Sequence, residues 1–96
     1  MIIKLTTSQF TEDNGYYYSP GFMQDTKDTM VTVAVWLSEP GEITIEASID
    51  QVEWVEIGGS SFTCNNIGMQ TYVDCHHGLA YRVKSDKAPE KAWILA

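Results

Sequence analysis

The chain has 96 residues and carries 13 Asp and Glu residues against 6 Lys and Arg, for a formal net charge of -7. One hydrophobic core fits this length, so we expect a single domain over residues 1–96. The negative charge argues against binding to nucleic-acid phosphates and against docking on an anionic membrane surface. With no run of 18 apolar residues and only a short apolar start, we expect no membrane span and no secretory signal, and therefore synthesis in the cytoplasm.

The N-terminal part of the chain contains one clear strand and one irregular stretch. Alternation predicts a first strand over residues 2–6, and residues 16–22, rich in Tyr, Gly and Ser, are expected to hold one irregular strand. Between them, Glu12-Asp13-Asn14-Gly15 is the one candidate calcium loop. Because Asn-Gly pairs are typical of turns with positive φ, we expect a turn there.

Residues 31–37 and 42–49 show the strongest alternation. In residues 31–37 both sets of alternate side chains are partly apolar, which is typical of a central strand. In the second segment the core face is expected to consist of Ile43, Ile45, Ala47 and Ile49. Because the connection around Pro40 is short, we expect the two strands to pair as an antiparallel hairpin.

The rest of the chain is expected to form short strands separated by turns. These strands cover residues 52–57, 61–64, 70–75, 79–84 and 92–95. No stretch combines helical periodicity with a capping signal. About seven or eight short strands predict an all-β fold, namely an antiparallel β-sandwich of Ig-like or jelly-roll-like type, with a small β-barrel as the alternative.

The charged residues are distributed unevenly along the chain. Residues 28–81 contain eight acidic residues and no Lys or Arg, whereas residues 82–96 contain four bases and two acids. An acidic body joined to a basic end is suited to pairing with copies of itself or with a basic partner. The alternative is an acidic surface that serves solubility alone.

The cysteines and histidines are the obvious candidates for chemistry. If Cys64 and Cys75 lie on neighbouring strands, they could be close enough to form a disulfide. Because we expect no secretory signal, we expect two free, buried thiols instead. With His76 and His77 they supply four zinc-type donors, yet consecutive strand residues point to opposite faces and no Cys-x2-Cys spacing is present. We expect no metal and no cofactor. A Cys64–His77 nucleophile–base pair is a weak signal, and without a known catalytic motif we expect no enzyme activity.

The aromatic residues suggest a binding surface. Tyr16, Tyr17 and Tyr18, followed by Phe22, form the candidate interface, because tyrosine offers contact area at low entropic cost. Stacking on a sugar or a nucleobase is one alternative, and covering the edge of the core is another. The three tryptophans are expected to lie in the core or at its rim, filling the space between two sheets: Trp36, Trp54 and Trp93.

Two segments resemble a known group of proteins. Residues 41–57, with Ser48-x-Asp50-Gln51-x-x-Trp54-x-x-Ile57, resemble a strand–turn–strand signature of small β-sandwich proteins from tailed bacteriophages, which occur as head-decoration, auxiliary capsid, fibre and tail components. Residues 78–84 resemble their closing strand. Gln51 stands where those proteins usually have a turn glycine. The signature also occurs in Ig-like and carbohydrate-binding modules.

The resemblance implies a non-enzymatic structural protein of a bacteriophage virion. Such a protein is made in the host cytoplasm and docks, in many copies or as a homo-oligomer, on the major capsid or tail protein. The expected mechanism is burial of an apolar, Tyr-rich patch, aided by charge complementarity. The alternative is a carbohydrate-binding or Ig-like adhesion module that uses exposed aromatic rings on a glycan, and an enzyme ranks last.

Overall fold

The computed structural model describes residues 1–24 and 29–96. Short strands account for most of these residues, and among them no helix is long and apolar enough to cross a membrane. In chain order the elements are β1 (Ile2–Thr6), the 3-10 turn η1 (Thr7–Gln9), β2 (Thr11–Asp13), β3 (Tyr16–Tyr18), β4 (Phe22–Met23), β5 (Val31–Leu37), β6 (Gly41–Ser48), β7 (Val55–Glu56), β8 (Phe62–Cys64), β9 (Ile67–Tyr72), β10 (Ala80–Ser85) and β11 (Pro89–Leu95).

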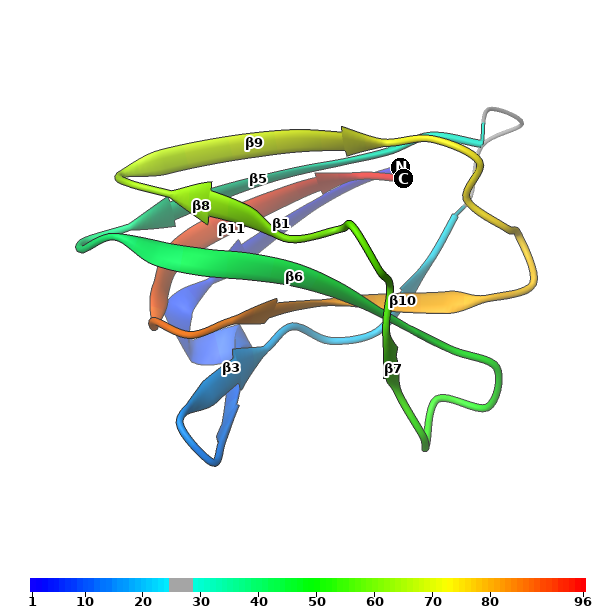
Figure 1. Ribbon diagram of the computed structural model, residues 1–96, viewed down its shortest axis with the longest axis horizontal. Coiled ribbons are helices and arrows are strands. Elements are labelled where there is room, and N and C mark those ends of the chain that lie inside the picture. Colours follow the sequence, from blue (N-terminus) through cyan, green and yellow to red (C-terminus); the bar gives the residue numbers. More distant parts are fainter. Residues whose placement is uncertain (25–28) are drawn as a thin grey trace.

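Two antiparallel sheets lie face to face and enclose the core (Figure 1). Sheet A has the strand order β1-β11-β5-β9. Sheet B has the order β2-β3-β10-β6-β7, with β4 also paired to β10 and β8 also paired to β6. The predicted all-β sandwich is therefore confirmed.

The strand pairs are nested along the chain. The first strand pairs with the last, β1 with β11; β3 and β4 pair with β10; β5 pairs with β9; and β6 pairs with β8. Successive pairs belong alternately to sheet A and sheet B, so the chain is one long antiparallel ribbon rolled upon itself. This is the topology of a jelly roll, the second of the two sandwich types that the sequence led us to expect.

The core is filled by alternate residues of the central strands. On β5, Val33, Val35 and Leu37 are almost completely buried, and Ile43 and Val83 face them from sheet B. Burial of each such side chain contributes about 1.5–3 kcal/mol relative to exposure. The prediction that β5 is a central strand is confirmed, since it lies between β11 and β9.

The predicted hairpin between residues 31–37 and 42–49 is wrong. β5 belongs to sheet A and β6 to sheet B, so the short connection through Pro40 crosses from one sheet to the other. A short connection forces an antiparallel direction but does not force pairing. Here the neighbours of β5 are already β11 and β9, and β6 pairs with β10 instead.

The expected core position of Ile49 is also wrong. β6 ends at Ser48, and Ile49 is 88% exposed. The strand ends because Asp50 turns the chain: its Oδ1 accepts hydrogen bonds from the Val52 N–H at 2.9 Å and the Glu53 N–H at 3.0 Å. These bonds hold the pKa of Asp50 below its usual value. Gln51, at the position of the missing glycine, adopts φ = 61°.

The turn at residues 12–15 matches the expectation. Asn14 and Gly15 both have positive φ, at 53° and 84°, and they connect β2 to β3. The Glu12 carboxylate accepts a hydrogen bond from the Gly15 N–H at 3.0 Å. The loop is therefore the tip of a hairpin that projects from sheet B (Figure 1).

Tyr72 ties the two sheets together at one edge of the sandwich. Its hydroxyl, at the end of β9, donates a hydrogen bond of 2.6 Å to the carbonyl oxygen of Ser60. Ser60 in turn is bound to β6, since its Oγ accepts the Ile45 N–H at 3.1 Å. Burial raises the pKa of the Tyr72 phenol.

We expect Tyr72→Phe to lower the free energy of unfolding by about 1–2 kcal/mol at pH 7, because it leaves the Ser60 carbonyl unpaired. The pKa is raised in the folded state, so the stabilisation by the phenol is complete below about pH 10 and is lost as the pH rises further. The difference between the two proteins should therefore narrow between pH 7 and pH 11 in urea unfolding. Tyr16→Phe is the control and should not change the free energy of unfolding at either pH. If the difference in stability between the wild type and Tyr72→Phe stays constant from pH 7 to pH 11, the assigned hydrogen bond from Tyr72 to Ser60 is contradicted.

Candidate docking surface

The outer face of sheet A is defined by the strand register. On each strand, alternate residues point away from the core, and the pairing aligns them in three rows across β1, β11, β5 and β9. These twelve positions together are named the sheet A face. Its rows are Ile2–Leu95–Thr32–Thr71, Lys4–Trp93–Ala34–Met69 and Thr6–Lys91–Trp36–Ile67.

The sheet A face is apolar and contains no carboxylate. Seven of its positions are apolar, three are Thr and two are Lys. Several of the apolar side chains are strongly exposed: Met69 is 70% exposed, Ile2 67%, Ile67 63% and Leu95 52%. Large apolar side chains that lie side by side on a surface indicate a binding surface, whereas single exposed ones do not.

The two tryptophans of β5 and β11 form the centre of this face. The rings of Trp36 and Trp93 lie 5.1 Å apart at an angle of 57°. Lys4 Nζ lies 4.7 Å from the Trp93 ring, and Lys91 Nζ lies 4.6 Å from the Trp36 ring. The prediction that Trp36 and Trp93 fill the space between the sheets is wrong, because they occupy the outward positions of their strands.

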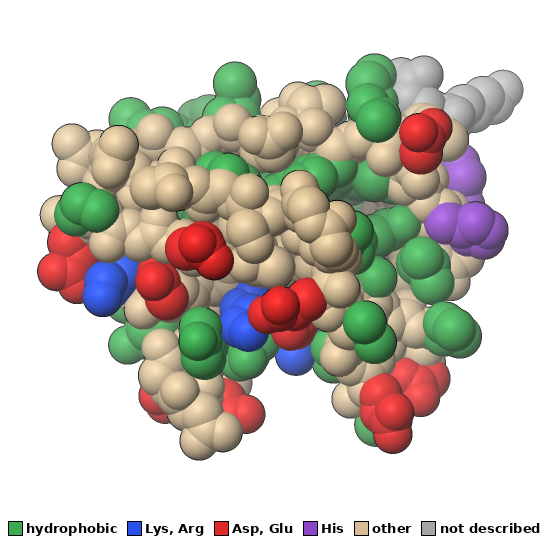
Figure 2. Space-filling view, viewed as in Figure 1, with side chains coloured by type: hydrophobic (Ala, Val, Ile, Leu, Met, Phe, Trp, Pro, Cys, Tyr) green, Lys and Arg blue, Asp and Glu red, His purple; other side chains and the backbone are tan. Residues whose placement is uncertain are grey.

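The acidic side chains gather on the opposite side of the molecule. Glu42, Glu46 and Glu56 belong to sheet B, and Asp50 and Glu53 belong to its projecting loop. In Figure 2, most red side chains lie in the lower half, over sheet B and its projecting loops. The net charge of -7 is thus arranged asymmetrically, with the sheet A face as an apolar, positively charged side.

The basic C-terminal segment does not form a single basic end. Lys91 lies on the sheet A face, whereas Arg82 and Lys84, on β10, lie on the outer side of sheet B. Alternation between the sheets in the jelly roll separates residues that are close in sequence. The positive charge on the sheet A face comes from both ends of the chain, Lys4 and Lys91.

On the outer side of sheet B, side chains of this chain pack on one another and pair their charges. Arg82 Nε donates a hydrogen bond of 2.7 Å to the buried Glu46 carboxylate, and its guanidinium lies between the rings of Tyr18, at 4.1 Å, and Trp54, at 4.5 Å. Thr44, Glu46 and Ser48, which alternate with the core-facing residues of β6, are buried as well. The charges here are satisfied within the chain. Trp54 packs on this outer side, so the prediction that it fills the space between the sheets is wrong.

The four residues of the predicted interface do not form one patch. Tyr16 is exposed with its ring 4.2 Å from Lys84 Nζ, and Tyr18 lies under Arg82. Tyr17 is partly buried and packs against the core. Phe22 is only 6% exposed and lies in the core beside Tyr81, so it presents no ring to a partner.

The two cysteines are free and buried, as expected. Burial raises the pKa of both thiols, which favours their neutral, unreactive form. His76 Nδ1 accepts the Gly78 N–H at 2.9 Å within its turn. Among residues 1–24 and 29–96, no group of three His, Cys, Asp or Glu side chains is placed to hold a metal ion.

The sheet A face spans four strands about 4.8 Å apart and about five residues of 3.3 Å rise, on the order of 300 Å² in projection. Five of its twelve positions are polar, so its apolar part is at the lower end of the patches of about 300–600 Å² that are often functional on monomers. In comparisons with protein-family models, curated proteins and solved structures, nothing matches the chain.

Proposed function

We propose that this chain is a non-enzymatic structural component of a bacteriophage virion, which docks through the sheet A face on a capsid or tail protein. The observation that carries the proposal is the composition of that face: twelve aligned positions with seven apolar side chains, two lysines and no carboxylate. Burial of apolar side chains provides the free energy of such contacts.

The charges on the face define the partner. Lys4 and Lys91 flank the tryptophan pair, so the complementary surface is apolar and bordered by carboxylates. The rest of this chain is acidic and would be repelled by such carboxylates, which fixes the orientation of docking. This chain would therefore bind its partner through the sheet A face only.

The size of the face favours binding in many copies. A stable interface buries about 800 Å² on each partner, well above the projected area of the sheet A face. One contact of this size is weak, so stable binding to a particle would require the bound copies to be held together, for example as a homo-oligomer that engages several equivalent sites at once. A multi-copy decoration or tail component meets this requirement.

The fold and the resemblance support the proposal in a general way. Jelly rolls are common in viral capsid domains but also in lectins, so the fold does not choose between the two. The resemblance of residues 41–57 to small phage β-sandwich proteins favours the virion, while the sheet A face indicates protein–protein contact.

The glycan-binding alternative is less well supported. Sugar platforms need an exposed ring face, and contact with Arg82 leaves at most one face each of the Tyr18 and Trp54 rings for a sugar. The exposed pair on sheet A, Trp36 and Trp93, is tilted by 57° and does not form a flat platform. A glycan array measured alongside particle binding distinguishes the two functions.

The test is co-sedimentation of the purified chain with virions of the phage or prophage whose genome encodes it. We expect saturable binding with a fixed number of copies per particle. Met69→Glu places a carboxylate on β9, in the middle row of the sheet A face, and should reduce the bound amount at least about tenfold. The matched control is Met23→Glu, on the β4 strand of sheet B, where Met23 is also exposed.

Circular dichroism should show both variants folded. Absence of the wild-type chain from the particles, or equal binding of Met69→Glu and the wild type, would overturn the proposal. Strong glycan binding without particle binding would favour the carbohydrate-binding alternative.

A further inference from the structure

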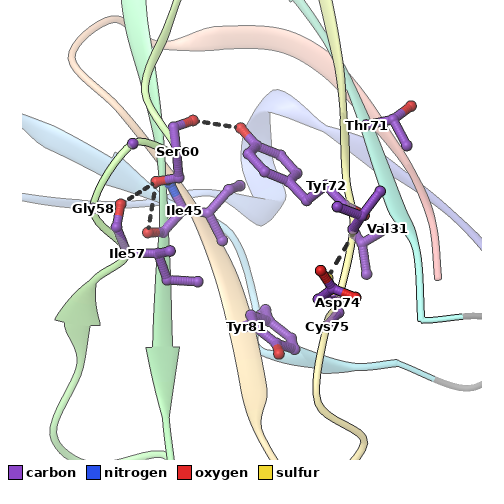
Figure 3. A pocket seen from close by; sticks show the side chains of 12 residues that line it. Val31, Ile45, Ile57, Gly58, Ser60, Thr71, Tyr72, Asp74, Cys75 and Tyr81 are labelled. Carbon is purple, nitrogen blue, oxygen red and sulfur yellow. Dashed lines mark hydrogen bonds between the residues drawn. The ribbon is translucent and has the colours of Figure 1, made fainter.

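A cleft of about 350 Å³ opens between the two sheets at one side of the sandwich. It lies where the end of β9 and the segment after it pass the turn that joins β7 to β8 (Figure 3). β7 covers only two residues of the edge of β6, so sheet B is incomplete here. The cleft adjoins the sheet A face at Thr71, and its other lining residues lie outside that face.

The frame of the cleft is held by hydrogen bonds within the chain. Ser60 Oγ accepts the Ile45 N–H at 3.1 Å and donates to the Ile57 carbonyl at 2.7 Å, which fixes the turn to β6. Tyr72 bridges the opening to the Ser60 carbonyl (Figure 3). The cleft is therefore preformed, as ligand sites commonly are.

The interior of the cleft is apolar. Val31, Ile45 and Tyr81 line it and are almost fully buried, and Cys75 lies beside them. The two tyrosine hydroxyls of the lining already have partners in the chain: the Tyr72 hydroxyl donates to the Ser60 carbonyl, and the Tyr81 hydroxyl accepts the His76 N–H at 2.8 Å. A ligand would thus be held by shape and apolar area rather than by hydrogen bonds.

The charge at the cleft selects against anions. Asp74 lines it and is exposed to solvent, and the chain as a whole has a net charge of -7. A carboxylate such as that of a fatty acid would be repelled. An uncharged apolar molecule meets no such penalty.

We propose that this cleft binds a small uncharged apolar molecule of about two fused aromatic rings. The size follows from the volume, since an engineered apolar cavity of about 150 Å³ binds one benzene. The site is formed by Val31, Tyr72 and Cys75 on the side of sheet A and by Ile45 and Tyr81 on the side of sheet B.

The probe is the neutral naphthalene dye prodan, titrated into the full chain and followed by its fluorescence. We expect saturable binding with a blue-shifted emission. Val73→Trp, at an exposed position that lines the cleft, should weaken binding at least about fivefold by narrowing the entrance. Val52→Trp, at an exposed position of the loop after β6, is the matched control and should bind as the wild type does.

The role of Asp74 is tested with the anionic dye anilinonaphthalene sulfonate. Asp74→Asn should strengthen its binding about fivefold and leave prodan binding unchanged. Asparagine tolerates the positive φ of 57° at this position, so the backbone should keep its conformation.

The location is tested by alkylation with N-ethylmaleimide and mass spectrometry. Bound prodan should slow the modification of Cys75, while the completely buried Cys64 serves as the internal reference. Three results would overturn the proposal: no saturable binding, equal binding by Val73→Trp and wild type, or loss of binding in Met69→Glu, which would place the dye on the sheet A face.

Discussion

At neutral pH, Arg82→Met is expected to lower the free energy of unfolding by about 3 kcal/mol. Arg82 neutralises Glu46, whose side chain is only 8% exposed, through a contact of 2.7 Å. Methionine retains part of the apolar stem between Tyr18 and Trp54 but leaves the Glu46 carboxylate buried without a counter-charge. Urea unfolding at pH 7 measures the loss.

Two further variants separate the buried charge from the packing. Adding Glu46→Leu to Arg82→Met removes the unpaired carboxylate and should restore stability to within about 1 kcal/mol of the wild type. Lys84→Met is the matched control, because Lys84 pairs with Glu56, which is 55% exposed, and should lose less than about 1 kcal/mol. Equal losses in Arg82→Met and Lys84→Met would contradict the assigned role of Arg82 in the cover of sheet B.

Gly68→Ala is expected to lower the free energy of unfolding by about 2 kcal/mol. Gly68 lies on β9 where β8 crosses over from sheet B. A Cβ atom there would lie 2.9 Å from Cε2 of Phe62 and 3.0 Å from Cβ of Cys64. Both neighbours are fixed by packing, so the strands must shift to admit the methyl group.

The matched control is Gly58→Ala, since a Cβ atom at Gly58 would meet nothing within 4 Å. It should change stability by less than about 0.5 kcal/mol. Phe62→Leu removes the ring from the Gly68 site, so in this background Gly68→Ala should have a smaller effect. Similar losses at both glycines would show that backbone conformation, rather than packing, makes Gly68 necessary.

Local patterns predicted the strands well because they follow from burial of alternate residues. Residues 2–6 and 31–37 agree with β1 and β5 as observed. The pairing of strands depends on contacts between distant segments, and no local pattern encodes it. The predicted hairpin is therefore wrong, although both of its strands exist.

The alignment of side chains on the sheet A face was missed for the same reason. The strand expected over residues 70–75 begins earlier, at Ile67, and Gly68 within it leaves room for the ring of Phe62. Both sets of alternate side chains in residues 31–37 are partly apolar, and Trp36 was expected in the core or at its rim. Only the order β1-β11-β5-β9 aligns these side chains with Ile2, Met69 and Trp93.

The most direct test of the docking surface is photo-crosslinking within assembled particles. A benzoylphenylalanine at Ile67, on the sheet A face, is compared with one at Val52, on the loop beyond β6; both positions are strongly exposed. We expect the probe at position 67 to cross-link to a virion protein and the probe at position 52 to form no such cross-link. Cross-links from position 52 alone, or from neither position in particles that contain the chain, would contradict docking through the sheet A face.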